Sequence, residues 1–125
     1  MSESDLRIIL EFEGDLHLNA VLDRVLAPLI VEEIKSQLPI EGRGALMRGE
    51  MKITLGLKRG NAKPTKEVSR GDVAYMPLGD SLCIYLKDMK TYSPVNIIGK
   101  ITSDNDILED LAQVRRGSQV TIRSI

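Results

Sequence analysis

The residues of this chain that could do covalent or metal chemistry are few and lie far apart. His17 is the only histidine and Cys83 the only cysteine, so no histidine lies near Cys83 in the sequence. A reactive cysteine needs a base or a cation to form its thiolate. We therefore interpret Cys83, between Leu82 and Ile84, as a small packing residue. We interpret His17 as an exposed polar residue and predict neither a catalytic residue nor a zinc site.

Two further patterns resemble binding motifs but lack their key residues. The glycines Gly42 and Gly44 do not lie between a strand and a helix, and no Lys-Ser or Lys-Thr pair follows them as in a P-loop. The acidic residues between Asp104 and Asp110 lack the glycine and the final glutamate of a calcium loop. Helix capping and solvent exposure account for these acids, so we predict no metal and no cofactor.

The composition predicts one globular domain with few aromatic residues. Of the 125 residues, 42% are hydrophobic and 28% charged, which is ordinary for a soluble protein and enough for a single core over residues 1–125. Aromatic residues make up only 3%, without tryptophan, so a stacking platform for bases would be hard to assemble. An acidic N-terminus, a single cysteine and no apolar run of ~20 residues predict a cytoplasmic protein without a membrane partner.

The charge is uneven although the net charge is −1. Between Arg43 and Arg70, eight Lys and Arg face two Glu, which gives this segment a net charge of +6. Such a strip could bind an anion, but it is more often a solvated surface. RNA binding through residues 43–70 is a weaker alternative because the strip contains no aromatic residue.

Alternating apolar residues predict a mainly β protein with two helices. Residues 6–12 and 16–22 form a hairpin pattern around a Gly-Asp turn. A helix is predicted from Pro28 to Leu38, with its apolar residues on one side and Pro39 after it. The remaining predicted elements are strands at 45–48, 51–57, 73–76, 82–86, 95–101 and 120–123, a polar loop at 58–66, and a helix that begins near 104 and ends at 117, with Arg115 and Arg116 in its last turn. Strands with only two helices favour a closed barrel.

Four sequence blocks in one order resemble a known family. They are GDVAYMPLG (71–79), SLCIYL (81–86), SPVNIIGKI (93–101) and LEDLAQVRRGSQV (108–120). Together they are similar to a family of small archaeal and bacterial proteins with a cyclophilin-like fold and an uncharacterised function, over residues 68–122. The resemblance implies a closed eight-stranded antiparallel β-barrel with a helix over each end.

The chain is also similar, more distantly, to true cyclophilins, in which Ile97–Ile101 corresponds to a V-F-G-K-V strand. Those enzymes isomerise X–Pro bonds, whose barrier is ~18–20 kcal/mol, with an arginine beside an aromatic pocket. Here Val95 stands where they have a histidine, and Leu82–Tyr85 replaces their Phe-rich strand. We therefore do not expect prolyl isomerase activity, although Arg48 is loosely placed like their arginine.

The resemblance implies a groove on the outside of the barrel. The residues of most interest are Tyr75, Tyr85, Tyr92 and Asn96, which lie in or beside the shared motifs. The corresponding strands line the cyclophilin groove. If the other face of the 82–86 strand fills the barrel, Cys83 and Tyr85 point to this groove, with Arg48 nearby. The predicted ligand-binding residues are thus Arg48, Tyr75, Cys83, Tyr85 and Asn96. The alternative is that Tyr75 and Tyr85 only cover the flank of the barrel and Asn96 satisfies a turn.

We predict a non-catalytic module that binds a peptide or a small anionic ligand in this groove. One alternative is an enzyme in the same groove, either a weak prolyl isomerase or a protein with another small-molecule activity. The second alternative is the RNA binding described above.

Overall fold

The computed structural model describes residues 4–125, which form nine strands, two α-helices and one 3-10 helix. The strands are β1 (Asp5–Phe12), β2 (Leu16–Asp23), β3 (Ile40–Met47), β4 (Glu50–Thr54), β5 (Thr65–Val68), β6 (Asp72–Met76), β7 (Ser81–Tyr85), β8 (Met89–Ile101) and β9 (Ser118–Ser124). The helices are α1 (Pro28–Gln37), α2 (Asn105–Glu109) and the 3-10 helix η1 (Asp110–Gln113). No helix within residues 4–125 is long and apolar enough to cross a membrane.

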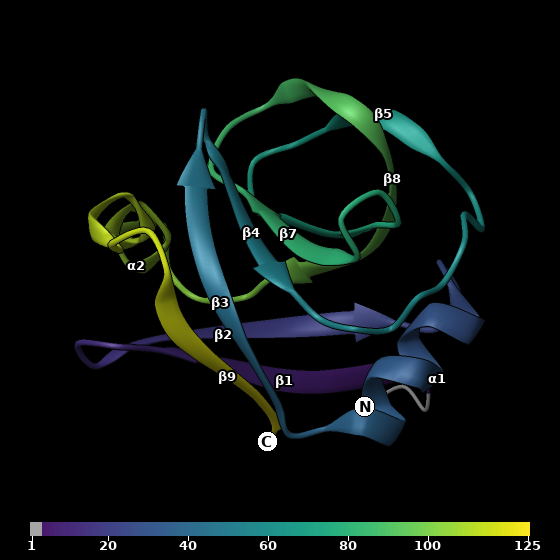
Figure 1. Cartoon of the computed structure of the whole chain (residues 1–125), viewed down its shortest axis with the longest axis horizontal. Helices are drawn as coiled ribbons and strands as arrows, with labels where there is room; N and C mark the ends of the chain where they lie inside the picture. Colours follow the sequence, from purple (N-terminus) through teal and green to yellow (C-terminus); the bar gives the residue numbers. More distant parts are fainter. Residues whose placement is uncertain (1–3) are drawn as a thin grey trace.

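Eight of the strands form a ring in which each pairs with both neighbours. The order is β1-β9-β3-β4-β7-β6-β8-β2, and the β1–β2 hairpin completes it. All of these pairings are antiparallel, and α1 and α2 lie on opposite sides of the ring (Figure 1). The predicted fold class, a cyclophilin-like barrel of eight antiparallel strands with two helices, is confirmed.

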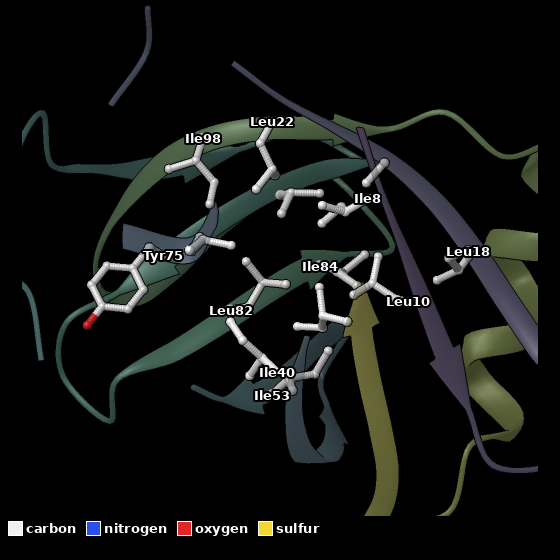
Figure 2. Packing of buried hydrophobic residues seen from close by; sticks show 14 of the residues in the cluster. Ile8, Leu10, Leu18, Leu22, Ile40, Ile53, Tyr75, Leu82, Ile84 and Ile98 are labelled. Atoms are coloured by element: carbon white, nitrogen blue, oxygen red, sulfur yellow. The ribbon is translucent and has the colours of Figure 1, made fainter. Parts of the chain in front are cut away.

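The core fills this ring with aliphatic side chains. Successive side chains of a strand point to opposite faces, and one face of each strand points into the ring. Examples are Ile8 and Leu10 of β1 and Leu82 and Ile84 of β7 (Figure 2). The helices add the buried residues Ile30, Val31, Ile34, Leu108 and Leu111. Only two aromatic side chains, Phe12 and Tyr75, belong to this cluster, so the core is largely aliphatic.

The ring closes where β8 passes closest to β2, at Gly99. This glycine pairs with Leu22 of β2 on one side and Val73 of β6 on the other. A Cβ atom at position 99 would lie 2.1 Å from the carbonyl oxygen of Val21. A close approach of two backbones is a common reason for a glycine within a strand, and here it lets the eighth pairing form.

Several predicted boundaries were wrong. The strand β3 begins at Ile40 rather than at 45, because Gly42 and Gly44 pair within it. A Cβ atom on Gly42 would lie 2.5 Å from the carbonyl oxygen of Thr54, so the glycine accommodates packing rather than a turn. The C-terminal helix ends at Gln113, so Arg115 and Arg116 follow it rather than stabilise its last turn.

The largest difference lies in strand β8, which is 13 residues long and begins at Met89 instead of at 95. Its first half pairs with β5, which was assigned partly to a polar loop. We call β5 together with residues 89–95 the β5–β8 arm. The arm curves over the outside of the β6–β7 hairpin (Figure 1). It was not predicted because TKEV and MKTYSP are polar sequences without a clear apolar alternation.

Candidate functional site

The predicted division of the two faces of β7 is confirmed. Leu82 and Ile84 lie in the barrel core, whereas Cys83 and Tyr85 lie in a second, smaller cluster on the outside. This outer cluster consists of Val68, Ala74, Met76, Cys83, Tyr85 and Val95. Because the β5–β8 arm covers it, Cys83 and Tyr85 are both 0% exposed. The outer face of β7 is therefore a second core and not the open groove that was expected.

The hydroxyl of Tyr85 is buried without a hydrogen-bond partner among residues 4–125. Burial raises the pKa of Tyr85, and the nearby Cys83 thiol and Glu50 carboxyl raise it further. Burial also raises the pKa of Cys83 to about 12, with Glu50 as the next cause. Both groups are thus protonated at neutral pH, and a protonated thiol is a poor nucleophile.

Replacing Tyr85 with phenylalanine should leave the free energy of unfolding unchanged or raise it by about 1 kcal/mol, since a buried hydroxyl without a partner is unfavourable. Urea unfolding followed by circular dichroism would measure the change. Tyr92→Phe is a suitable control, because its ring is exposed and its hydroxyl is free to contact water. A loss of more than about 1 kcal/mol in Tyr85→Phe would show that the hydroxyl has a partner in solution.

Tyr75 lies in the barrel core and not on the outside. Its ring joins the main cluster, and its hydroxyl points away from the neighbouring aliphatic side chains (Figure 2). The hydroxyl donates to Asp80 Oδ1 at 2.5 Å and accepts from the Arg59 N–H at 3.1 Å. Burial and the Asp80 carboxylate raise the pKa of Tyr75 to about 12. Tyr75 therefore connects the core to the loop that contains Arg59.

Asn96 is buried and fixes the same loop. Its Oδ1 accepts from the backbone N–H groups of Ala62 at 2.7 Å and Lys63 at 3.0 Å. Its Nδ2 donates to Asn61 Oδ1 at 3.1 Å and to the carbonyl of Tyr75 at 3.3 Å. All four contacts stay within the protein, which favours the interpretation that Asn96 holds the 58–66 segment in place.

Arg48 lies in a different environment, at the tip of a tight hairpin between β3 and β4. Met47 pairs with Glu50, so Arg48 and Gly49 form a two-residue loop, with φ of 52° and 83°. The Gly49 carbonyl accepts from the Leu86 N–H at 2.8 Å, which fixes the loop against the end of β7. Arg48 itself has no ion pair or side-chain hydrogen bond within the described part of the chain.

A cleft of about 580 Å³ separates this loop from the first half of β8. We call it the Arg48 cleft; its lining residues are Met47, Arg48, Glu50, Lys52, Met89, Lys90, Thr91 and Tyr92. Its volume is within the ~300–1,000 Å³ range of small-molecule sites. Of the five predicted site residues, only Arg48 lines this cleft.

The cleft combines positive charge with exposed apolar surface. Arg48, Lys52 and Lys90 supply the charge. Met47 is 54% exposed and Tyr92 94% exposed, so both present apolar surface to solvent. Tyr92 was grouped with the residues of the predicted groove but was not among the predicted ligand-binding residues. Lys90 was missed because residues 87–94 were expected to connect two strands. Tyr92 was the available signal, as the one tyrosine outside an apolar run.

The basic strip does not remain one free cationic surface. Arg43 donates to the carbonyl of Gly117 at 3.0 Å, and Arg59 pairs with Glu33 on α1. Arg70 pairs with Glu109 on α2 at 2.9 Å. Three of its eight cations thus connect different elements of the fold, so fewer remain for a nucleic acid. RNA binding stays a prediction.

Comparison with known proteins agrees with the geometry. The sequence model of the cyclophilin-like family matches residues 5–123. The solution structure of a hypothetical protein from Archaeoglobus fulgidus is similar over the whole of both chains, with 25% identity and a TM-score of 0.80. No curated protein matches the sequence.

A second similar structure is that of McbB in complex with tryptophan, with 18% identity and a TM-score of 0.78. The similarity covers 93% of this chain but only 44% of McbB, so the chain spans less than half of that protein's length. At this identity the similarity shows a shared fold. Since the family match covers nearly the whole sequence, the chain belongs to the cyclophilin-like family.

Proposed function

We propose that this protein is a non-catalytic module that binds a small molecule in the Arg48 cleft, and that the ligand has an acid group and an apolar body. The observation that carries the proposal is Arg48 itself, a cation without an internal partner at the mouth of a cleft. Arginine is well suited to hold a carboxylate or phosphate, because its planar guanidinium makes two parallel hydrogen bonds.

The backbone at Arg48 supports a functional role. Two-residue loops with positive φ at both positions strongly favour Asn-Gly or Gly-Gly. A non-glycine residue in the left-handed region costs of order 1–3 kcal/mol, and arginine is not among the residues that tolerate it best. The loop geometry alone would thus favour Asn at position 48, whereas ligand binding gives a reason for Arg.

The surroundings of Arg48 favour a small ligand over a peptide. The β5–β8 arm covers the outer face of β7, so the extended groove that a peptide would follow is occupied by the chain itself. What remains is a bounded cleft with Met47, Met89 and Tyr92 as apolar walls. These side chains would contact the apolar body of the ligand while Arg48 contacts its acid group.

The choice of a first probe follows from this description. Indole-3-propionate has one carboxylate and a planar apolar body, and an indole is also the side chain of the tryptophan in the McbB complex. Titration by NMR should shift the amide signals of Arg48, Glu50 and Tyr92 in one binding curve. No shift in these signals at the highest soluble concentration of the probe would contradict the proposal.

Replacing Arg48 with asparagine separates binding from folding. Because Asn-Gly suits this loop, Arg48→Asn should raise the free energy of unfolding by about 0.5–1 kcal/mol. The affinity for indole-3-propionate should fall by about tenfold or more, since a charge-assisted hydrogen bond is lost. Arg116→Asn is the control, because Arg116 is exposed and does not line the cleft. Equal affinity in Arg48→Asn and wild type would refute the role of Arg48.

A further inference from the structure

The Arg48 cleft contains one acidic side chain, Glu50, and its position is unusual. Glu50 is only 8% exposed. Its Oε1 pairs with Lys52 Nζ at 3.4 Å, and the Tyr85 hydroxyl is the other donor close to its carboxyl. A carboxylate can accept about four hydrogen bonds, and buried charges are normally paired and hydrogen-bonded. Glu50 thus has unused acceptor capacity in a cleft.

The polar group beside Glu50 is also unsatisfied. Tyr85 pairs with Glu50 across β4 and β7, and its buried hydroxyl has no partner in the described chain. Unsatisfied buried groups are rare in native proteins, and a ligand or an ordered water often completes their hydrogen bonds. Tyr85 is fully buried and does not line the Arg48 cleft, so of these two groups only Glu50 can present its free acceptor positions to a ligand.

We infer that the ligand of the cleft also carries an ammonium group, which binds Glu50, so that the ligand class is a zwitterionic amino acid with a bulky apolar side chain. This inference rests on the proposed function and adds its second charge. Arg48 and Glu50 both line the cleft and are two residues apart along the β3–β4 hairpin. An α-amino acid carries a carboxylate, which could bind Arg48, next to an ammonium group, which could bind Glu50.

An ammonium group fits Glu50 better than a metal ion does. No group of three or more His, Cys, Asp or Glu side chains in residues 4–125 is arranged to hold a metal. An ammonium has three donors and needs only one carboxylate with additional acceptors. Lys52 occupies only one of the acceptor positions of Glu50, which leaves room for a second cation.

The test compares three ligands on the wild-type protein by calorimetry or NMR titration. L-Tryptophan carries both charges, indole-3-propionate lacks the ammonium, and tryptamine lacks the carboxylate. L-Tryptophan should bind at least about tenfold more tightly than each of the other two, because each lacks one charge-assisted contact. This comparison needs no variant, so it does not depend on whether a substitution at Glu50 folds.

Two variants assign the effect to Glu50. Glu50→Gln should remove the preference for L-tryptophan over indole-3-propionate. Lys52→Met should keep the preference for L-tryptophan, since the carboxylate remains. If Glu50 only served to pair with Lys52, both variants would behave alike.

The outcomes distinguish the two proposals. If indole-3-propionate binds as tightly as L-tryptophan, and Arg48→Asn weakens both, the inference about the ammonium is overturned while the proposed function stands. That result would mean that the free acceptor positions of Glu50 contact ordered water only. If none of the three ligands binds, both proposals fail.

Discussion

Replacing Gly99 with alanine should lower the free energy of unfolding by about 3 kcal/mol, at the upper end of what one excess methyl group costs in a packed site. The added Cβ would lie 2.1 Å from the Val21 carbonyl oxygen and 2.9 Å from the Leu22 Cα. Both are backbone atoms in paired strands, so they cannot move aside as the end of a side chain can. Relief would require β2 and β8 to separate, which would open the ring at its closing pair.

Thermal and urea unfolding would measure this effect. For a chain of this length, about 3 kcal/mol corresponds to a fall in Tm of roughly 10 °C. Gly60→Ala is the matched control, because no atom lies within 4 Å of the Cβ position and φ at Gly60 is not positive. If both variants unfold within about 1 kcal/mol of wild type, the strands tolerate separation and the closing pair matters little for stability.

The fold could be predicted because most strands turn one face to the barrel core. Their apolar residues therefore alternate or cluster along the sequence. Alternation in β1 and β2 identified the first hairpin, and apolar runs identified β6 and β7. The helix α1 begins at Pro28, as the role of proline in a first helical turn predicts. These signals are local, and they depend on residues that are neighbours in sequence.

The site could be predicted only in part, because it depends on contacts between distant segments. Arg48 was identified, but its neighbours Lys90 and Tyr92 reach the cleft only because β8 begins at Met89 and the β5–β8 arm curves around the hairpin. No local pattern reveals that arm. For the same reason Tyr85 was expected in an open groove, although its strand face was correct.

The arm also shows how the second core and the cleft depend on each other. Val68 and Val95 from the arm pack on Cys83 and Tyr85, which buries the β7 face. The same segment then places Met89 and Tyr92 opposite Arg48. The apolar residues beneath the arm thus position the cleft walls, so a polar substitution at Val95 should weaken ligand binding as well as folding.

The second large effect is expected for Asn96→Ala, which should lower the free energy of unfolding by about 3 kcal/mol, since four hydrogen bonds of about 1 kcal/mol each are lost and water replaces some of them. The carbonyl of Tyr75 would lose a donor inside the protein. The N–H groups of Ala62 and Lys63 would lose their acceptor, and hydrogen exchange at both should accelerate.

The matched control is Asn61→Ala, which removes only one of these four contacts and should cost less than about 1 kcal/mol.

The decisive measurement is ligand affinity. Asn96 was predicted to contact the ligand, but its hydrogen bonds hold the loop before β5 and it does not line the Arg48 cleft. If Asn96→Ala weakens indole-3-propionate binding as strongly as Arg48→Asn does, the binding site extends to Asn96 and the cleft alone does not define it. If stability falls while affinity is retained, the fixed geometry of the loop is a requirement of folding, and separate residues of this barrel surface carry stability and binding.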